Sequence, residues 1–158
     1  MKVLHFYRTY YPDTFGGVEQ VIRQMVAGSA RLGIDAEVLT LTRDVANLEI
    51  EYEGRPIHRV PLNLEIASTG FSWAALSRFK ELAQQADIIH YHFPWPFMDM
   101  AHFLCGIQKP SVVTYHSDIV RQKYLLKLYQ PLQNKFLRGV DRIVATSPNY
   151  LKTSPTLN

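Results

Sequence analysis

Short apolar runs alternate with amphipathic segments along most of the chain, and this alternation constrains the fold more than any other feature. Val3–Tyr7 is an apolar run suited to a buried strand. Hydrophobic residues then recur at helical spacing between Val18 and Leu32, and Gly33 marks the end of that segment. Repeated alternation of this kind gives a parallel sheet covered by helices on both faces. The sequence therefore predicts an α/β fold, a Rossmann-like three-layer α/β/α arrangement with a mostly parallel sheet.

The remaining elements are expected in the same alternating order. Ser72 is the expected N-cap of a helix, and Glu53-Gly54-Arg55-Pro56 between β-prone flanks predicts a hairpin. Pro131 is expected to kink or break its helix, and a turn without a closing helix is expected from Pro148 onward. The expected strands cover 36–41, 87–93, 112–116 and 142–147, the hairpin covers 48–60, and the helices cover 72–85, 97–104 and 119–137.

Length and composition limit the class of protein. The chain has 158 residues, enough for a single domain with one core, and its 47% hydrophobic and 20% charged residues are typical of a soluble globular fold. No apolar run approaches the roughly 20 residues of a membrane span, and the first residues lack the pattern of a signal peptide. Cys105 is the single cysteine, which excludes an internal disulfide and favours a core position. A reducing, cytoplasmic location is expected.

Positive charge is concentrated in the last third of the chain. Residues 1–105 carry 9 Lys and Arg against 12 Asp and Glu, whereas residues 106–158 carry 8 against 2. Such a distribution favours an anionic partner, either phosphate groups or an anionic membrane surface. Nucleic acid is not expected, because no nucleic-acid-binding motif accompanies the charge. The segment 119–138 holds no acidic residue, and its candidate contact residues are Arg121, Lys123, Lys127 and Arg138.

Two adjacent glycines, Gly16 and Gly17, stand between the first strand and the first helix. Glycines before a helix allow a ligand close to the backbone, and the N–H groups of the first turn can hold a phosphate. The alternative is a tight turn with a glycine cap. Glu19 lies in the first helical turn, where the helix dipole favours a carboxylate. The spacing matches neither a P-loop nor a Gly-x-Gly-x-x-Gly loop.

Histidines stand at the ends of two neighbouring strands. His90 and His92 are two residues apart and therefore share one face of their strand, and His116 ends the next strand. Open parallel sheets bind ligands at the carboxyl ends of their strands, so these side chains are candidate site residues. One alternative is a metal site, which would indicate a metal-dependent hydrolase. The other alternative is that backbone hydrogen bonds satisfy these histidines and they have no further role.

Sequence strings in four places resemble the retaining GT-B glycosyltransferases of family 4. They occur in the order found in that family and cover nearly the whole chain. The resemblance implies the N-terminal, acceptor-side half of such an enzyme. The strings are Arg8-x-Tyr10-Tyr11-Pro12-Asp13-x-x-Gly16-Gly17-Val18-Glu19, Asp87-x-x-His90-x-His92, Thr114-x-His116-x-Asp118 and Asp141-Arg142-Ile143-Val144-Ala145-Thr146-Ser147-Pro148.

The resemblance also implies roles for individual residues. Gly16 and Gly17 would approach the diphosphate of a nucleoside diphosphate sugar, which is a co-substrate; no metal and no other cofactor is implied. His116 would line the catalytic cleft, and Asp118 would orient it or bind a hydroxyl. Similar enzymes with lipid acceptors use basic helices to lie on the inner membrane face. The residues expected to contact the acceptor are Arg8, Tyr10, His92 and Glu19.

The enzyme implied by the resemblance transfers a sugar to the hydroxyl of a glycan or lipid-linked acceptor in the synthesis of cell-surface polysaccharide or glycolipid. The second domain of that family carries a Glu-x7-Glu element, and the present sequence holds none. The chain is therefore expected to be one part of a longer transferase and to be inactive by itself. The alternative from another class is a stand-alone module that binds nucleotides or anions without catalysis.

Overall fold

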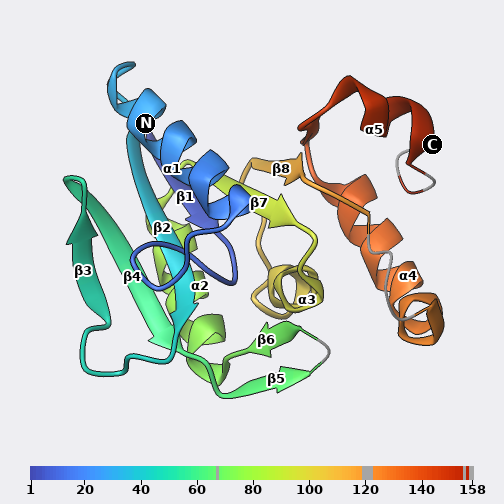
Figure 1. Cartoon of the computed structure of the whole chain (residues 1–158), viewed down its shortest axis with the longest axis horizontal. Coiled ribbons are helices and arrows are strands. Elements are labelled where there is room, and N and C mark those ends of the chain that lie inside the picture. Colours follow the sequence, from blue (N-terminus) through green and yellow to red (C-terminus); the bar gives the residue numbers. More distant parts are fainter. Residues whose placement is uncertain (67, 119–122, 155, 157–158) are drawn as a thin grey trace.

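The computed structural model describes residues 1–66, 68–118, 123–154 and 156, except for the side chains of 123–126, 150 and 151. A seven-stranded sheet crosses these residues in the order β3-β4-β2-β1-β7-β8-β9 (Figure 1). Neighbouring strands are parallel except β3 and β4, which form an antiparallel hairpin at one edge. The strands are β1 Lys2–Phe6, β2 Asp35–Thr42, β3 Glu49–Tyr52, β4 Arg55–Pro61, β7 Ile88–Phe93, β8 Ser111–Tyr115 and β9 Arg142–Ala145.

Helices connect the strands and cover the two faces of the sheet, with α1 in front of it and α2 behind it in Figure 1. The predicted three-layer α/β arrangement with a mostly parallel sheet is confirmed. The buried side chains of α1 include Ile22 and Val26, which recur at helical spacing as expected. The helices are α1 Gly17–Ala30, α2 Trp73–Gln85, α3 Pro96–Leu104, α4 Lys123–Gly139 and α5 Pro148–Thr153.

Side-chain alternation along β1 decides which residues face each helical layer. Phe6 stacks on Phe79 of α2, with ring centroids 4.4 Å apart. His5, its neighbour, therefore points to the opposite face of the sheet. His5 is in register with His90 of β7, and the following pair on that face joins His92 to Thr114 of β8. Polar side chains from three strands thus gather on the face away from α2.

A second hairpin, not predicted from the sequence, lies next to α3. It consists of β5 Leu64–Ile66 and β6 Thr69–Phe71. Trp95, only 1% exposed, donates an indole hydrogen bond of 3.0 Å to the carbonyl of Gly70. A Cβ on Gly70 would lie 2.9 Å from methyl groups of Leu41 and Leu62. The hairpin is therefore fixed to the core by the residue that precedes α3.

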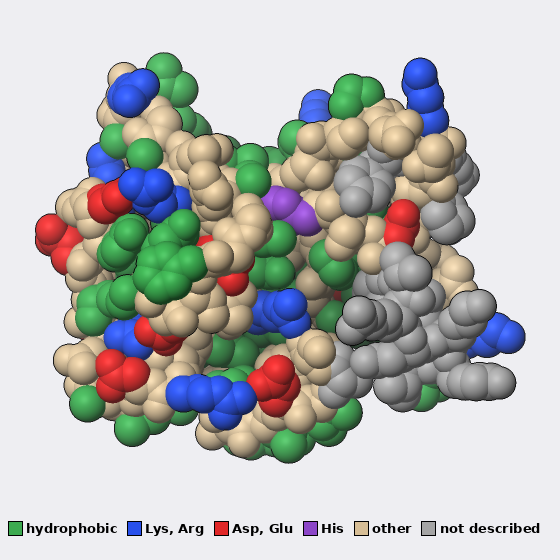
Figure 2. Space-filling model, viewed as in Figure 1, with side chains coloured by type: hydrophobic (Ala, Val, Ile, Leu, Met, Phe, Trp, Pro, Cys, Tyr) green, Lys and Arg blue, Asp and Glu red, His purple; other side chains and the backbone are tan. Residues whose placement is uncertain are grey.

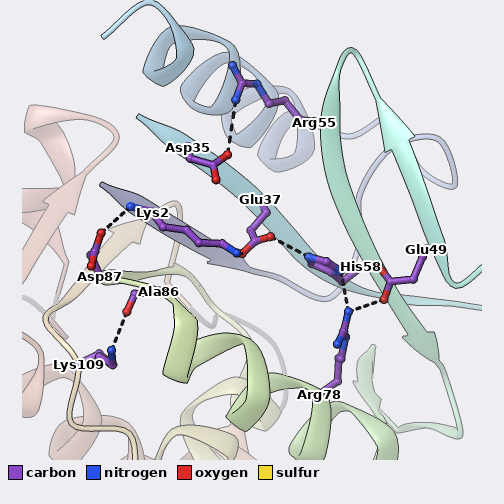
Figure 3. Close-up of polar contacts among 10 residues, drawn as sticks. All are labelled: Lys2, Asp35, Glu37, Glu49, Arg55, His58, Arg78, Ala86, Asp87 and Lys109. Atoms are coloured by element: carbon purple, nitrogen blue, oxygen red, sulfur yellow. Dashed lines mark hydrogen bonds and ion pairs between the residues drawn. The ribbon is translucent and has the colours of Figure 1, made fainter. Parts of the chain in front are cut away.

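A polar network ties the outer strands to α2 (Figure 3). Glu37 of β2 accepts from the Lys2 ammonium at 2.7 Å and contacts the Nε2 atom of His58 at 2.9 Å. The other ring nitrogen of His58 lies 2.5 Å from a carboxylate oxygen of Glu49. Arg78 of α2 reaches the second oxygen of Glu49 at 2.7 Å. The buried Glu37 and His58 side chains are thereby matched in charge.

Two expectations about prolines have different outcomes. Pro131 lies inside α4, which continues from Lys123 to Gly139, so the helix is not broken there, and the alternative of a kink stays a prediction. Pro131 is exposed, so water can satisfy the backbone carbonyl that has lost its helical partner. Pro148 is the first residue of α5, where its missing N–H costs nothing, so a short helix stands where only a turn was expected. Among the described residues, none of the helices is long and apolar enough to span a bilayer.

Candidate active site

The candidate site lies at the ends of β1, β7 and β8, here called the carboxyl edge. β1 is followed in the chain by β2 on one side of it in the sheet, while β7 occupies its other side. The strand order therefore reverses direction at β1. The loops that follow the strands on the two sides of such a point leave in opposite directions, and ligands bind in the crevice between them. Figure 2 shows histidine atoms at the surface in the middle of this view, between the part that carries α1 and the part that carries α4 and α5.

The glycine loop meets the N-terminus of α1 at this edge. Gly16 is the N-cap in an extended conformation, and Gly17 is the first helical residue. A Cβ on Gly16 would lie 2.3 Å from the Oε2 atom of Glu19, whereas a Cβ on Gly17 would have no atom within 4 Å. A side chain at position 16 would therefore displace the Glu19 carboxylate, while the space beside Gly17 is open to a ligand.

Glu19 stabilises the glycine loop through a hydrogen bond to a loop residue. Its side chain is buried at 7% exposure and accepts a hydrogen bond of 2.9 Å from the hydroxyl of Thr14. Its negative charge also acts on His116 and works to raise the pKa of that histidine. The glycine loop and the end of β8 therefore lie close enough to share one electrostatic environment. The acceptor contact predicted for Glu19 stays a prediction, because its described contact is with the loop.

Arg8 and Tyr10 occupy different environments although they belong to one sequence string. Arg8 donates to the carbonyl of Ser68 in the β5–β6 hairpin, and its buried Nε atom has no hydrogen-bond partner among the described residues. Tyr10 is only 2% exposed and packs edge-on against the rings of Tyr11 and Tyr52. Tyr10 thus belongs to the core behind the loop, and Arg8 remains the better placed of the two for a ligand.

A row of histidine rings crosses the sheet below the carboxyl edge. The Nδ1 atom of His5 lies 3.0 Å from the Nε2 atom of His92, and the Nδ1 atom of His92 lies 3.1 Å from the Nε2 atom of His116. His90 stacks on both His5 and His92 at 4.7 Å between ring centroids, but its own Nε2 atom contacts the hydroxyl of Thr114 at 2.7 Å. His5 and His92 are buried, and His116 is partly exposed.

These histidines are neutral at physiological pH. Burial lowers the pKa of His116 to about 4, against the opposing effect of Glu19. Burial also lowers the pKa of His90 to about 4. The pKa values of His5 and His92 lie well below the usual range, first because of burial and second because of the neighbouring imidazoles. A neutral imidazole has one N–H donor and one acceptor nitrogen, so each ring can take part in a directed hydrogen-bond chain.

The metal alternative considered for His90, His92 and His116 meets a different grouping in the structure. Ring nitrogens of His5, His90 and His92 all lie within 4.8 Å of one another. A metal ion binds in the plane of each imidazole ring, at the nitrogen lone pair. His90 stacks on His5 and on His92, with ring planes tilted by 25° and 8°. A stacked ring directs its nitrogen lone pairs along its own plane and not toward the nitrogens of the rings it covers, so the three rings do not converge on one point, and the in-plane contact between His5 and His92 is a hydrogen bond.

Asp118 follows β8 and connects it to the segment after α5. Its Oδ1 atom accepts from the Tyr115 hydroxyl at 2.6 Å and from the Ser154 hydroxyl at 2.7 Å. The described partner of His116 is His92 rather than Asp118. Orientation of His116 by Asp118 therefore stays a prediction, and the contacts of Asp118 indicate that it anchors the chain after α5 to the strand that carries His116.

Residues 123–138 of the basic segment lie in α4. Lys127 and Arg138 are exposed, and Leu128, next to Lys127 in the chain, is 82% exposed. Arg121 and the side chain of Lys123 lie outside the described residues. Lys135 lies over the ring of Phe103 at 4.9 Å. The opposite side of the helix is held to α3, where Tyr129 donates to the buried Asp99.

The sequence alone missed His5 as a site residue. It stands in a short apolar strand, where a single histidine gives no periodic signal. Pairing of β1 with β7 puts His5 directly beside His90. Only the strand order could supply that pairing.

Comparison with known proteins gives one family for the chain. The profile of the family described as Glycosyltransferase Family 4 matches residues 15–153. The D-rhamnosyltransferase WbpZ of Pseudomonas aeruginosa is 57% identical over 157 residues, which are 99% of this chain and 41% of the relative. The O-antigen chain mannosyltransferase C of Escherichia coli is 57% identical over 160 residues, 99% of this chain and 42% of the relative. The chain thus spans about two fifths of the length of these relatives.

The fold has a match among solved structures. A sucrose-phosphate synthase structure from Thermosynechococcus elongatus superposes with a TM-score of 0.63 at 16% identity, over 98% of this chain and 82% of that one. At this identity the likeness concerns the fold alone, and it agrees with the sheet order and helical layers described above. The family expected from the glycine loop and the histidine strands is confirmed. The chain belongs to glycosyltransferase family 4 and has the fold of the N-terminal half of a GT-B enzyme.

Proposed function

We propose that this chain is the acceptor-side half of a retaining glycosyltransferase that extends a cell-surface polysaccharide. The observation that carries the proposal is the meeting of two parts of the site: Glu19 lies against Gly16 in the glycine loop, and its charge acts on His116 at the end of β8. The loop that would receive a diphosphate and the histidine that would face the transferred sugar therefore share one edge of the sheet.

The donor proposed is a nucleoside diphosphate sugar with the D-manno configuration. One relative is named as a D-rhamnosyltransferase and the other as a mannosyltransferase, and D-rhamnose is the 6-deoxy form of D-mannose. Both relatives are 57% identical to the chain, so their names support this class of sugar and do not select between its two members.

The proposed mechanism uses the open space beside Gly17. Negative charge grows on the diphosphate as the bond to the sugar breaks. The N–H groups of the first turn of α1 are aligned to stabilise that charge, and the absence of a side chain at Gly17 allows close approach. His116 and Arg8 are proposed to bind oxygens of the reacting sugars. The acceptor is proposed to be the terminal hydroxyl of a glycan on a lipid carrier.

A peripheral position on the cytoplasmic face of a membrane belongs to the same proposal. Lys127 and Arg138 are exposed on α4, as is Leu128, and cations near an anionic leaflet contribute about 1 kcal/mol each. The metal-dependent hydrolase considered above has no comparable support, since the stacked rings of His5, His90 and His92 do not converge on a point.

The experiment that tests the proposal uses the whole transferase that contains this chain. It is incubated with nucleoside diphosphate forms of D-mannose and of 6-deoxy-D-mannose and with a synthetic lipid-linked acceptor, and the product is analysed by mass spectrometry and NMR. Transfer of one of these sugars with the anomeric configuration of the donor is expected. Transfer with the opposite anomeric configuration would contradict a retaining mechanism. Binding of the donor without transfer would instead favour a non-catalytic nucleotide-binding module.

A further inference from the structure

The three histidines His5, His92 and His116 form a continuous chain of hydrogen bonds from the core to the carboxyl edge. The Nδ1···Nε2 distances are 3.0 Å and 3.1 Å, and each link joins the same pair of atom types. His92 is the middle member and has only one N–H while it is neutral. It must therefore donate in one link and accept in the other, so both hydrogen bonds run in the same direction.

Two directions are possible, and they differ at the ends of the chain. In the inward direction His116 donates to His92, His92 donates to His5, and the remaining N–H of His5 is on its Nε2 atom. In the outward direction His5 donates to His92, His92 donates to His116, and the N–H of His116 is on its Nδ1 atom. The direction therefore determines which nitrogen of His116 carries the proton.

The inner end of the chain favours the outward direction. The Nε2 atom of His5 is buried and has no hydrogen-bond partner among the described residues. The inward direction would leave an N–H donor there without an acceptor, and buried N–H groups without partners are rarer in proteins than acceptors without partners. The outward direction leaves only a lone pair at that position.

The outer end favours the same direction. Aligned N–H···N bonds add their dipoles. The positive end of this row of hydrogen bonds is the ring with the terminal N–H, which is His116 in the outward direction. The carboxylate of Glu19 acts on His116, while the inner histidines are influenced by other imidazoles. A negative charge at the His116 end stabilises the arrangement with the positive end of the dipole there.

From these observations we infer that His5 and His92 are positioning residues that hold His116 as the Nδ1–H tautomer, with its Nε2 atom accepting from His92. His116 then offers a hydrogen-bond donor, and no free lone pair, toward the carboxyl edge. The inference also rests on the proposed function in one respect: in a transferase, His116 would stabilise negative charge on a sugar or phosphate oxygen and would not act as a general base from this tautomer.

The test measures the tautomer directly and needs neither substrate nor activity. The chain is labelled with ¹⁵N-histidine, and long-range ¹H–¹⁵N spectra at pH 7 distinguish protonated from unprotonated ring nitrogens. His5, His92 and His116 are each expected to show a protonated Nδ1 atom and an unprotonated Nε2 atom. A protonated Nε2 atom on His116 would overturn the inference, whatever the outcome of transferase assays.

Variants at the inner end make the test specific. His5→Phe removes the first donor without touching His116, and the His116 signals are expected to change from one tautomer to a mixture. His90→Phe is the matched control, because His90 stacks on His5 and His92 but bonds to Thr114 outside the chain. The control should leave the His116 tautomer unchanged. A His116 tautomer that is unaffected by His5→Phe contradicts the role of His5, and the spectrum of the unsubstituted chain decides the tautomer even where a variant fails to fold.

Discussion

The Nδ1 atom of His92 lies 3.1 Å from the Nε2 atom of His116, so the partly exposed histidine at the carboxyl edge is supported by one that is fully buried. This relationship leaves the Nδ1 atom of His116 as the nitrogen that a ligand would meet. What His116 can do in catalysis depends on whether its Nδ1 atom presents a hydrogen or a lone pair to that ligand.

In the whole transferase, His116→Ala should lower kcat by about 100-fold, the range observed for positioned catalytic groups. His116→Asn should retain more activity than His116→Gln, because the amide of Asn can replace an N–H at the Nδ1 position and that of Gln reaches the Nε2 position. Steady-state kinetics check the order, and circular dichroism checks that each variant is folded. Equal activity of the Asn and Gln variants would speak against a donor at Nδ1.

Substitutions at the two glycines should have separable effects. Gly16→Val should lower both stability and turnover, since its Cβ would lie 2.3 Å from the Glu19 carboxylate. Gly17→Val should leave the unfolding free energy within about 0.5 kcal/mol of the original, because no atom lies near its Cβ. Its kcat/KM should nevertheless fall by about 100-fold if the diphosphate approaches there. Urea denaturation and kinetics on the same two variants measure both quantities, and full activity of Gly17→Val would remove the diphosphate from that position.

Acid should destabilise the chain over the range set by the buried histidines. The pKa values of His90 and His116 are lowered to about 4, and those of His5 and His92 lie lower than usual as well. Below about pH 6.5 the unfolded state binds protons that the folded state does not, so the unfolding free energy falls as pH decreases toward 4. The slope should approach about 1.4 kcal/mol per pH unit for each histidine. Urea titrations between pH 7 and 5 test this, and His90→Phe should reduce the slope by the contribution of one proton.

His58 should give the opposite dependence on pH. Burial works to lower its pKa, but hydrogen bonds to Glu37 and Glu49 outweigh burial, and the pKa is raised above its ordinary value. A raised folded-state pKa stabilises the fold below about pH 6.5, and this contribution is lost as pH rises through the folded-state value. The contribution of His58 should therefore decrease from pH 6.5 to 8, while the four histidines with lowered pKa values act in the opposite direction near pH 6.5. The difference in unfolding free energy between the original chain and His58→Gln isolates this contribution and should shrink as pH rises from 6.5 to 8; a difference that does not change with pH would assign the effect to another group.

Charge reversal on α4 tests the contact with anionic lipid. The chain should sediment with vesicles that contain anionic lipid and not with neutral vesicles, and added salt should release it as the Debye length shrinks from about 10 Å at 0.1 M to about 3 Å at 1 M. Lys127→Glu with Arg138→Glu should abolish sedimentation; Lys123→Glu can be added, although its side chain lies outside the described residues.

The control for this experiment is Arg31→Glu with Lys80→Glu, which changes the charge equally at exposed positions on other elements. It should leave sedimentation largely intact. An equal loss in both double variants would indicate attraction by net charge alone. Equal binding to neutral and anionic vesicles would favour a soluble phosphate-bearing acceptor or another domain as the partner of α4.

Local patterns were sufficient to predict the alternation of most strands and helices along the chain and the shared face of His90 and His92. They were not sufficient where a contact joins distant segments. His5 became part of the site only because β1 pairs with β7, and Tyr10 is buried because Tyr52, from the β3–β4 hairpin, packs against it. The β5–β6 hairpin has strands of three residues, Leu64–Ile66 and Thr69–Phe71, which are too short for a recognisable alternation.

The contrast between Gly16 and Gly17 has an evolutionary consequence. A side chain at position 16 would meet the Glu19 carboxylate before any substrate arrives, whereas a Cβ at position 17 would meet no atom within 4 Å. Among family members, a glycine retained at the first position would therefore be maintained by selection for folding. A glycine retained at the second would be maintained by selection for turnover. The adjacent glycines, which form one motif in the sequence, would thus be subject to two different kinds of selection.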